Sequence, residues 1–205
     1  MEGELEVKLI AITRYLGGNG TAEELIEAAG RACYRSEPKG QPGEFVQRRI
    51  GEGHESIIEH ASATFDISGI SRACSHQLVR HRIASYSQES QRYVDMSAPE
   101  FVVPPSVSGN AEAEAAFERF CDTVSSAYSE LRELGIRKED ARFLLPNATA
   151  TRIIVTMNFR SWRHFIETRA LDPGAQWEIR ELARRVLDVL NEQAPSVFGD
   201  LHARA

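Results

Sequence analysis

The sequence is 205 residues long, 42% of its residues are hydrophobic, and its formal net charge is -6 at pH 7. That is enough apolar material for the core of one globular domain. The negative charge argues against a dedicated binder of nucleic acid or of anionic membranes, since such proteins usually carry a basic excess. No apolar run reaches the roughly 18 residues of a membrane span, and the acidic start MEGELEVKLI is unlike a signal peptide, so we expect a cytoplasmic protein.

The first elements follow from local patterns. Residues 7–15 are β-branched and apolar enough for a strand, and Gly17-Gly18-Asn19-Gly20 predicts a turn after it. Thr21 stands three residues before Glu24, the spacing of a capping box, which predicts the start of a helix that ends near Tyr34.

The middle of the chain predicts a short helix at 45–50 and a strand at 61–70, where apolar and polar residues alternate. Ser71 can cap a following helix. If that helix runs over 71–84, one face of it carries Gln77, Arg80 and Ala84. Arg82 then lies on a different face of the helix from Arg80. The serine-rich stretch 85–90 then predicts a polar loop.

A long amphipathic helix is predicted from Ala111, because the apolar positions that follow recur at spacings of three and four until Gly135. The remaining elements are expected as a helix at 138–145, a strand at 152–158, and helices at 161–169 and 175–193. Together these elements predict one α+β domain over residues 1–205, with a mostly antiparallel sheet flanked by helices.

Two stretches of this acidic chain are locally basic. Residues 72–92 contain four arginines against Glu89, and residues 152–169 contain four arginines against Glu167. The planar guanidinium suits phosphate, so these clusters point to a phosphorylated ligand or cofactor. Surface ion pairs between helices explain the same residues equally well at this point. Arg80 and Arg82, on different faces of one helix, would serve two ligands or two sides of a seam between subunits.

The sequence gives little support for a metal site or for a catalytic nucleophile. The segment GHESIIEH lacks the spacing of a zinc-protease helix, and His76 and His81 are five residues apart, so no metal site is expected. Cys33, Cys74 and Cys121 are widely spaced, which favours reduced core thiols over disulfides. Ser90 has no histidine nearby in sequence, and we expect it to bind a ligand rather than to act as a nucleophile.

One set of motifs carries a family resemblance. Arg80-His81-Arg82 with Ser85, Ser90 and Arg92 resembles the signature R-H-R-x-x-S-x(4)-S-x-R of the flavin-dependent thymidylate synthases. The segments GHESIIEH, Ala141 to Pro146, Asn158 to Ala170 and Ala175 to Ile179 are similar to further motifs of that family, in the family's order.

The resemblance implies methylation of dUMP to dTMP, with 5,10-methylenetetrahydrofolate as carbon donor, FAD as hydride carrier and NADPH as reductant. It also implies a homotetramer whose active sites lie between chains. Two basic clusters in an acidic protein fit this expectation, since dUMP and the FAD pyrophosphate are both anionic.

The resemblance also assigns individual residues. The implied FAD contacts are Ser56, Arg80, His81, Arg82, Gln88, Asn158, Arg160 and His164. The implied dUMP contacts are Gln77, Arg80, Gln88, Glu89, Ser90, Gln91, Arg92, Arg142 and Arg169. Arg169 is the implied catalytic residue, because in the family its counterpart lies against the uracil ring and favours ionisation at N3.

This sequence departs from the family's pattern in places. Many relatives have a His between the Arg-Ala and Gln-Trp-Glu motifs, where this chain has Leu171-Asp172-Pro173-Gly174. Ser87, Gln88 and His164 also replace residues common in relatives, and Gln can donate as well as accept hydrogen bonds.

Two other functions stay open at this point. One is a nucleic-acid-binding module that stacks bases on Tyr86, Tyr93 and Trp162. The other is a non-catalytic sensor of flavin or nucleotide, which has lost synthase activity.

Overall fold

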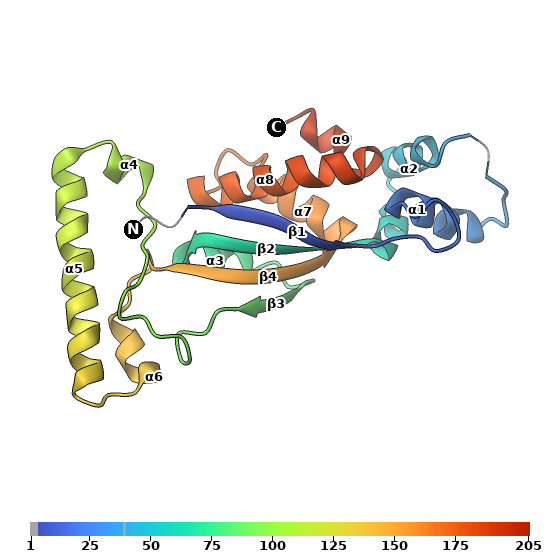
Figure 1. The fold of residues 1–205 in the computed structure, drawn as a ribbon. Coiled ribbons are helices and arrows are strands. Elements are labelled where there is room, and N and C mark those ends of the chain that lie inside the picture. The colour runs from blue at the N-terminus through green and yellow to red at the C-terminus, as the bar shows by residue number, and fades with distance from the viewer. Residues whose placement is uncertain (1–3, 39) are drawn as a thin grey trace. The chain divides into compact units, whose positions relative to one another are not determined.

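The computed structural model describes residues 4–38 and 40–205, which form a four-stranded sheet with helices (Figure 1). The strands are β1 (Glu6–Ile12), β2 (Ser62–Ser71), β3 (Ser85–Gln88) and β4 (Ala150–Asn158), in the order β1-β2-β4-β3. The N–H of Thr13 donates to the carbonyl of Ser62 at one end of the β1–β2 pair, while Gly69 meets the backbone of Glu4 at the other. This is the pairing of antiparallel strands, and it confirms the predicted α+β class.

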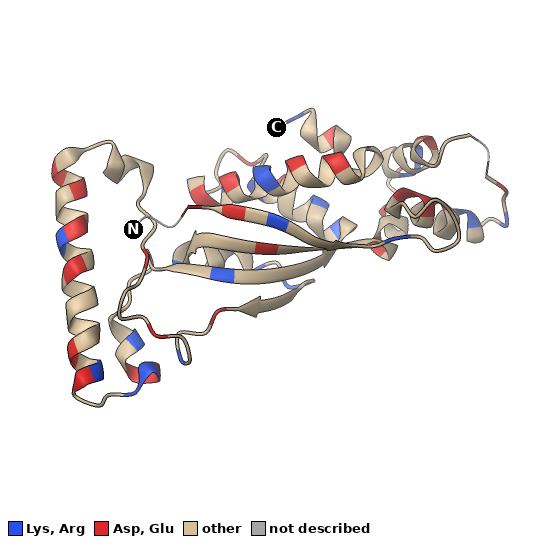
Figure 2. Cartoon of the chain, in the orientation of Figure 1, with Lys and Arg blue, Asp and Glu red and all other residues tan. Residues whose placement is uncertain are grey.

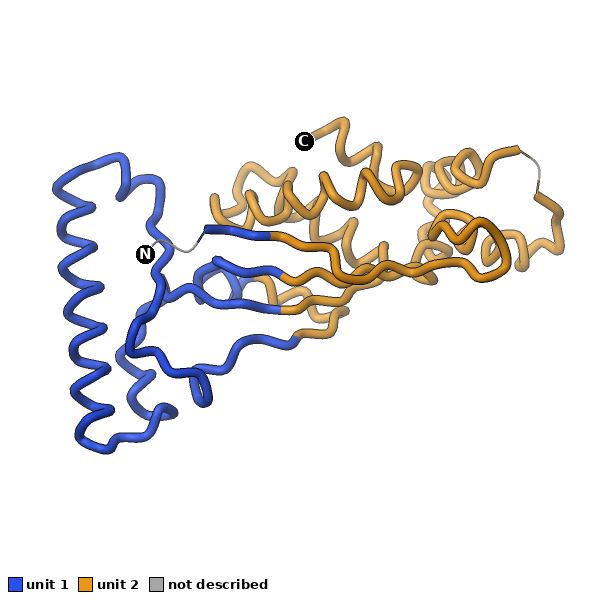
Figure 3. The backbone as a smooth tube through the Cα atoms, viewed as in Figure 1, with its two compact units in different colours: residues 1–6, 67–77, 87–153 blue, residues 7–66, 78–86, 154–205 orange. Residues whose placement is uncertain are grey.

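The chain divides into two compact units (Figure 3). Unit 1 contains residues 1–6, 67–77 and 87–153, and unit 2 contains residues 7–66, 78–86 and 154–205. The sheet strands contribute residues to both units. The single domain over residues 1–205 stays a prediction.

Unit 2 contains most of the helices. These are α1 (Ala22–Ala32), α2 (Pro42–Gly51), the 3-10 helix η1 (Glu55–His60), α7 (Phe159–Arg169), α8 (Trp177–Gln193) and α9 (Pro195–His202). The capping box of Thr21 and Glu24 is present at the start of α1, as predicted. Trp162 of α7 is fully buried, packs edge-on against Phe65 of β2 at 5.1 Å and donates its Nε1–H to the carbonyl of Ala63. This core fixes α7 to the sheet within unit 2.

Unit 1 contains α4 (Pro105–Ser108), α5 (Ala111–Glu133), α6 (Lys138–Ala141) and η2 (Arg142–Leu144), and most of α3 (Arg72–Leu78). The long helix α5 is confirmed, with Asn110 as its cap and Gly135 at a φ of 81° just beyond its end. Its buried side chains are Cys121, Val124 and Tyr128.

The segment after Ser71 differs from the prediction. Ser71 does cap α3, since its Oγ accepts the N–H of Cys74, but the helix ends at Leu78 rather than near residue 84. The phenol of Tyr86 lies within hydrogen-bond distance of the carbonyls of Leu78 and His81, which stabilises a turn there instead of further helix. The predicted polar loop at 85–90 begins as strand β3, because residues 85–88 pair with β4.

Other local predictions failed as well. Helix α9 and the short helices η1 and α4 were not predicted. Cys33 is exposed rather than part of the core, whereas Cys74 and Cys121 are buried. None of the helices in the described part of the chain combines the length and the apolarity needed to cross a bilayer.

Candidate functional site

Charge is unevenly distributed among the helices (Figure 2). Acidic residues predominate along α5, whereas α7 carries Arg160, Arg163 and Arg169 against the single acid Glu167. Helix α7 therefore carries a net positive charge of its own in a chain of net negative charge.

A cavity of about 840 Å³ lies in unit 2, between η1, the turn after α3, and α7. Its lining includes seven of the residues assigned from the sequence, which are Arg80, His81, Arg82, Asn158, Arg160, His164 and Arg169. Arg80 and Arg82 both line this cavity. The predicted placement on different faces of one helix was wrong, because α3 ends before either residue. That they serve two ligands or two sides of a seam stays a prediction.

Helix α7 supplies one wall of the cavity. The Oδ1 of Asn158 accepts the N–H of Ser161 at 2.8 Å and caps the helix, and the N–H of Phe159 donates to the carbonyl of Ala61 in unit 2. Residues 160, 164 and 168 are spaced by four and share one face of the helix. The cap uses the oxygen of Asn158 and leaves its amide NH₂ as a donor. The positive end of the α7 dipole thus lies at the cavity, where it favours an anion.

Arg160 is held by two carboxylates that were not predicted. Its Nη1 donates to Glu59 at 2.6 Å, and its Nε lies 3.5 Å from Glu55. The hydrogen bond to Glu59 raises the pKa of Arg160 above its ordinary value. Glu55 and Glu59 both line the cavity. They lie in the GHESIIEH segment, so the signal was present, but nothing in the sequence shows that they pair with Arg160.

His81 and Arg169 meet in the same cavity. The Nε of Arg169 donates to the Nε2 of His81 at 3.1 Å. The imidazole packs edge-on against Phe165 at 5.1 Å and lies 5.8 Å from the ring of His164. Burial, the charge of Arg169 and the neighbouring His164, in that order of importance, together lower the pKa of His81 to about 4. His81 is therefore neutral at pH 7 and can accept the hydrogen bond.

Unit 1 brings a second group of predicted residues together. Arg92 lies 3.6 Å from the carboxylate of Glu139, and the Nε of Arg142 donates to the backbone carbonyl of the same residue at 3.1 Å. Gln88 donates from its Nε2 to Thr151 of β4 at 3.3 Å. Glu139 thus holds two arginines that are 50 residues apart in sequence near one another.

Arg72 belongs to this group, although it was not among the assigned site residues. Burial lowers the pKa of Arg72, and the nearby charge of Arg142 lowers it further, against an opposing effect from Glu89. The basic stretch 72–92 contained the signal for Arg72. Its approach to Arg142, which is 70 residues away, depends on the tertiary fold.

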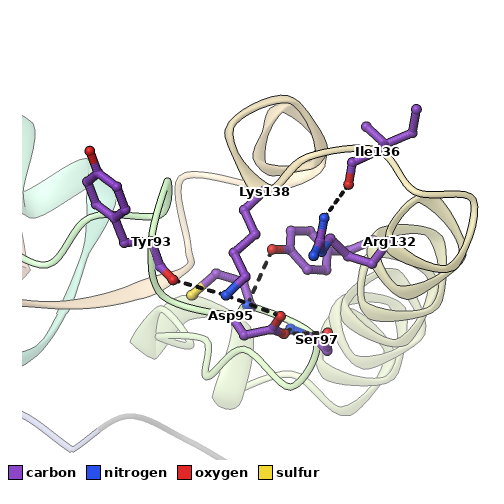
Figure 4. A network of polar contacts seen from close by, with 8 residues as sticks. Tyr93, Asp95, Ser97, Arg132, Ile136 and Lys138 are labelled. Carbon is purple, nitrogen blue, oxygen red and sulfur yellow. Dashed lines mark hydrogen bonds and ion pairs between the residues drawn. The ribbon is translucent and has the colours of Figure 1, made fainter.

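The segment after Arg92 is anchored by a polar network (Figure 4). The Nζ of Lys138 donates to the carbonyl of Tyr93 at 3.0 Å and lies 3.6 Å from the carboxylate of Asp95. Asp95 also accepts the N–H of Ser97, and hydrogen bonds to Ser97 lower its pKa. The network joins residues 93–97 to α6, and so holds the chain just after Arg92 to the helix just before Arg142.

The remaining assigned residues lie outside the cavity lining. Ser56 is exposed in η1, next to Glu55. Gln77 is half-buried in α3, and the stretch Glu89, Ser90, Gln91 follows β3 in unit 1. The Oγ of Ser90 accepts the N–H of Arg92, which closes a turn. The assigned residues therefore fall into two sets, one in each unit.

Comparisons with known proteins agree on one family. A family model described as thymidylate synthase complementing protein matches residues 13–196. The chain is 44% identical over 202 residues to the flavin-dependent thymidylate synthase of Nitratidesulfovibrio vulgaris, covering 88% of this chain and 82% of that protein. Proteins of the same name from Geobacter sulfurreducens and from Mycobacterium sp. (strain KMS) are 47% and 45% identical over 189 and 200 residues. These alignments cover 87% and 86% of this chain, and 81% and 78% of those proteins.

Proposed function

The chain belongs to the flavin-dependent thymidylate synthases, and from that premise we propose that it methylates dUMP to dTMP, with 5,10-methylenetetrahydrofolate as carbon donor and NADPH as reductant through FAD. The family match over residues 13–196 carries this proposal. The reaction also accounts for two arginine-rich groups in a protein of charge -6, because both FAD and dUMP are anionic.

The cavity of unit 2 fits FAD by its size and its donors. A volume of about 840 Å³ lies in the range of cofactor pockets. Arg160, the amide of Asn158 and the start of α7 supply hydrogen bonds and positive charge for a pyrophosphate. Glu59 contacts Nη1 and Glu55 contacts Nε of Arg160, so Nη2 is the nitrogen that we assign to a ligand. When bound, FAD supplies a hydride carrier between NADPH and the transferred carbon.

We assign catalysis to Arg169. A guanidinium has a pKa above about 12, so it stays charged and cannot take a proton from the substrate. Placed against the uracil ring, it would stabilise negative charge that develops when N3 is ionised. No protein nucleophile is needed in this scheme. Burial raises the pKa of the Cys121 thiol, which argues against a reactive thiolate there.

We assign the phosphate of the nucleotide to the unit 1 group. Arg80 and Arg169, which the family resemblance also assigns to dUMP, lie in unit 2. Arg92 and Arg142, which contact Glu139, would bind the phosphate as paired cations. Gln88 and Ser90 add neutral donors and acceptors from the chain between β3 and Arg92. In this assignment Ser90 binds the nucleotide and attacks nothing.

A homotetramer with sites shared between chains belongs to the same proposal. Its support is that unit 1 exposes large apolar side chains, with Phe143 83% exposed and Leu134 70% exposed. Exposed apolar surface of this kind is typical of faces that associate with another chain. A cytoplasmic location is likewise proposed, because the reaction supplies a nucleotide for biosynthesis.

The nucleic-acid-binding alternative loses one of its three stacking residues in the structure. Trp162 is fully buried, and its indole N–H is bonded to Ala63. The ring of Tyr86 is half-buried with its hydroxyl engaged in the turn. A base has no access to a fully buried indole. Tyr93 is 74% exposed, but the family match favours the synthase over this alternative. The non-catalytic sensor differs from a synthase only in turnover, which the experiment below measures.

The test is the visible absorption spectrum of the purified protein with FAD, before and after dUMP is added. We expect a flavin spectrum that dUMP perturbs, and release of the C5 hydrogen of dUMP when NADPH and methylenetetrahydrofolate are supplied. A protein that takes up no flavin contradicts the proposal. Flavin uptake without C5 hydrogen release identifies the sensor instead.

A further inference from the structure

We propose that His81 is a positioning residue, which fixes the guanidinium of Arg169 by accepting its Nε–H. This inference rests on the proposed function, since it concerns the residue assigned to catalysis there. It differs from the family-based assignment of His81, which makes the imidazole a flavin contact.

The geometry of Arg169 carries the first step. Its Nε donates to the Nε2 of His81 at 3.1 Å, which is a normal hydrogen-bond length. Among the described residues, no other hydrogen bond to this guanidinium is found. One fixed bond at Nε sets the plane of the group and leaves both Nη nitrogens free to contact a ligand in the cavity.

The acceptor is itself held on several sides. The imidazole of His81 meets the ring of Phe165 edge-on, with centroids 5.1 Å apart and planes at 87°. Its backbone N–H donates to Leu78, and its carbonyl accepts from the hydroxyl of Tyr86 at 2.7 Å. Burial raises the pKa of Tyr86 to about 12, so this hydroxyl keeps its proton. Leu78 and Tyr86 therefore fix the backbone of His81, and Phe165 packs against its imidazole.

The bond defines one chemical form of His81. Nε2 can accept only if the imidazole is neutral and carries its proton on Nδ1. The charged or titratable groups that line the cavity with His81 come from three elements: Glu55 and Glu59 from η1, Arg80 and Arg82 from the turn, and Arg160, Arg163, His164, Glu167 and Arg169 from α7. Five arginines stand against three acids in this lining, and burial, Arg169 and His164 lower the pKa of His81. The Nδ1–H is left as a donor.

Steady-state kinetics with a matched pair of variants tests the positioning role. His81→Phe keeps the aromatic packing against Phe165 and removes the acceptor, whereas His81→Gln keeps an acceptor oxygen. We expect His81→Phe to lower kcat by about 10- to 100-fold while the flavin spectrum is retained, since a misplaced catalytic group costs that much. His81→Gln should recover most of the loss. His76→Phe, at an exposed position on α3, should leave kcat unchanged.

A double-mutant cycle separates positioning from a structural effect. If His81 acts through Arg169, adding His81→Phe to Arg169→Lys should change kcat by less than about 3-fold, because the partner geometry is already lost. Full additivity of the two substitutions overturns the proposal. Loss of flavin from His81→Phe also overturns it, since it assigns the imidazole to the cofactor.

A readout that needs no turnover is the ¹⁵N spectrum of the histidine rings, with the His81 signal identified as the one missing from His81→Phe. We expect wild-type His81 to be the neutral Nδ1–H form at pH 7, and to move toward the other tautomer in Arg169→Lys. A wild-type His81 protonated on Nε2 overturns the proposal even if the enzyme is active. An inactive wild type with the expected tautomer contradicts the proposed function and leaves the His81–Arg169 bond standing.

Discussion

Arg163 of α7 forms a bidentate ion pair with Asp200 of α9, with Nη1 at 2.6 Å from Oδ1 and Nη2 at 2.7 Å from Oδ2. Nη1 also donates to the carbonyl of Val197. The Arg163 side chain is only 5% exposed. The carboxylate of Asp200 therefore supplies the negative charge that compensates this buried guanidinium. The pair joins the last helix of the chain to the helix that supplies the cavity wall.

Asp200→Asn should therefore destabilise the protein, by about 2 kcal/mol, since it removes the charge that compensates a buried guanidinium. The half-exposed position of Asp200 keeps the cost below that of a fully buried pair. The measurement is the free energy of unfolding from a urea titration at neutral pH.

Asp188→Asn is the matched control. Asp188 lies 3.2 Å from His202 of α9, but both side chains are about half exposed or more. Its loss should change stability by less than about 0.5 kcal/mol. Equal losses of unfolding free energy in the two variants would show that burial of Arg163 does not strengthen its ion pair with Asp200.

This ion pair also shows where sequence-based prediction ends. The start of α1 was predictable, because Thr21 and Glu24 interact within one turn of helix. Helix α9 was missed, and its contacts are with residues distant in sequence, such as Arg163, which is 37 residues from Asp200. Strand β3 was missed for a similar reason. Its serines favour a loop locally, and pairing with β4 overrides that preference.

The candidate site was also predictable only in part. Sequence motifs identified Arg80 and Arg160, and the structure places both at one cavity. The pairing of Arg160 with Glu59 spans 101 residues, and no local pattern encodes it. The approach of Arg72 to Arg142 is equally non-local. Sequence motifs therefore identified the arginines of the site, whereas the residues that contact them are determined by the tertiary fold.

The lowered pKa of His81 predicts a pH dependence of stability. Its pKa falls from about 6.5 when unfolded to about 4 in the folded protein. Between these values the unfolded chain binds more protons, so stability rises with pH across the window. The contribution of His81 is fully present above about pH 6.5 and is lost as pH falls toward 4.

Comparing wild type with His81→Phe in urea titrations at pH 4.5 and pH 7 isolates this effect. We expect the variant to lose less stability than wild type on acidification, because it has no imidazole to protonate. An identical loss in the two proteins would show that His81 titrates normally.

Arg169→Ala should lower turnover sharply, by about 10²- to 10³-fold, because it removes the charge proposed to stabilise the ionised uracil. The flavin spectrum should be largely retained, since the other cavity arginines remain in place. Stopped-flow absorbance of the flavin, recorded with and without dUMP, checks both points. Loss of flavin from this variant would mean that Arg169 binds the cofactor rather than the substrate.

Arg72 provides the sharpest prediction for the unit 1 group. Burial and the nearby charge of Arg142 both lower the pKa of Arg72, and only Glu89 opposes them. Like charges crowded in this way are stabilised by a bound anion. Arg72→Met should therefore weaken binding of dUMP by about 10-fold, the effect of losing roughly 1.4 kcal/mol of charge-assisted interaction. The stability of the ligand-free protein should stay the same or rise slightly, because the repulsion is relieved.

Calorimetric titration of dUMP at low and high salt measures this effect. Arg119→Met, on the exposed surface of α5, is the control for a general loss of positive charge. If Arg72 acts on the phosphate, its removal should also reduce the salt dependence of binding, while removal of Arg119 leaves that dependence unchanged. Equal weakening by both substitutions would reduce Arg72 to a contributor to net charge. Unchanged affinity in Arg72→Met would mean that Arg92 and Arg142 bind the phosphate without it.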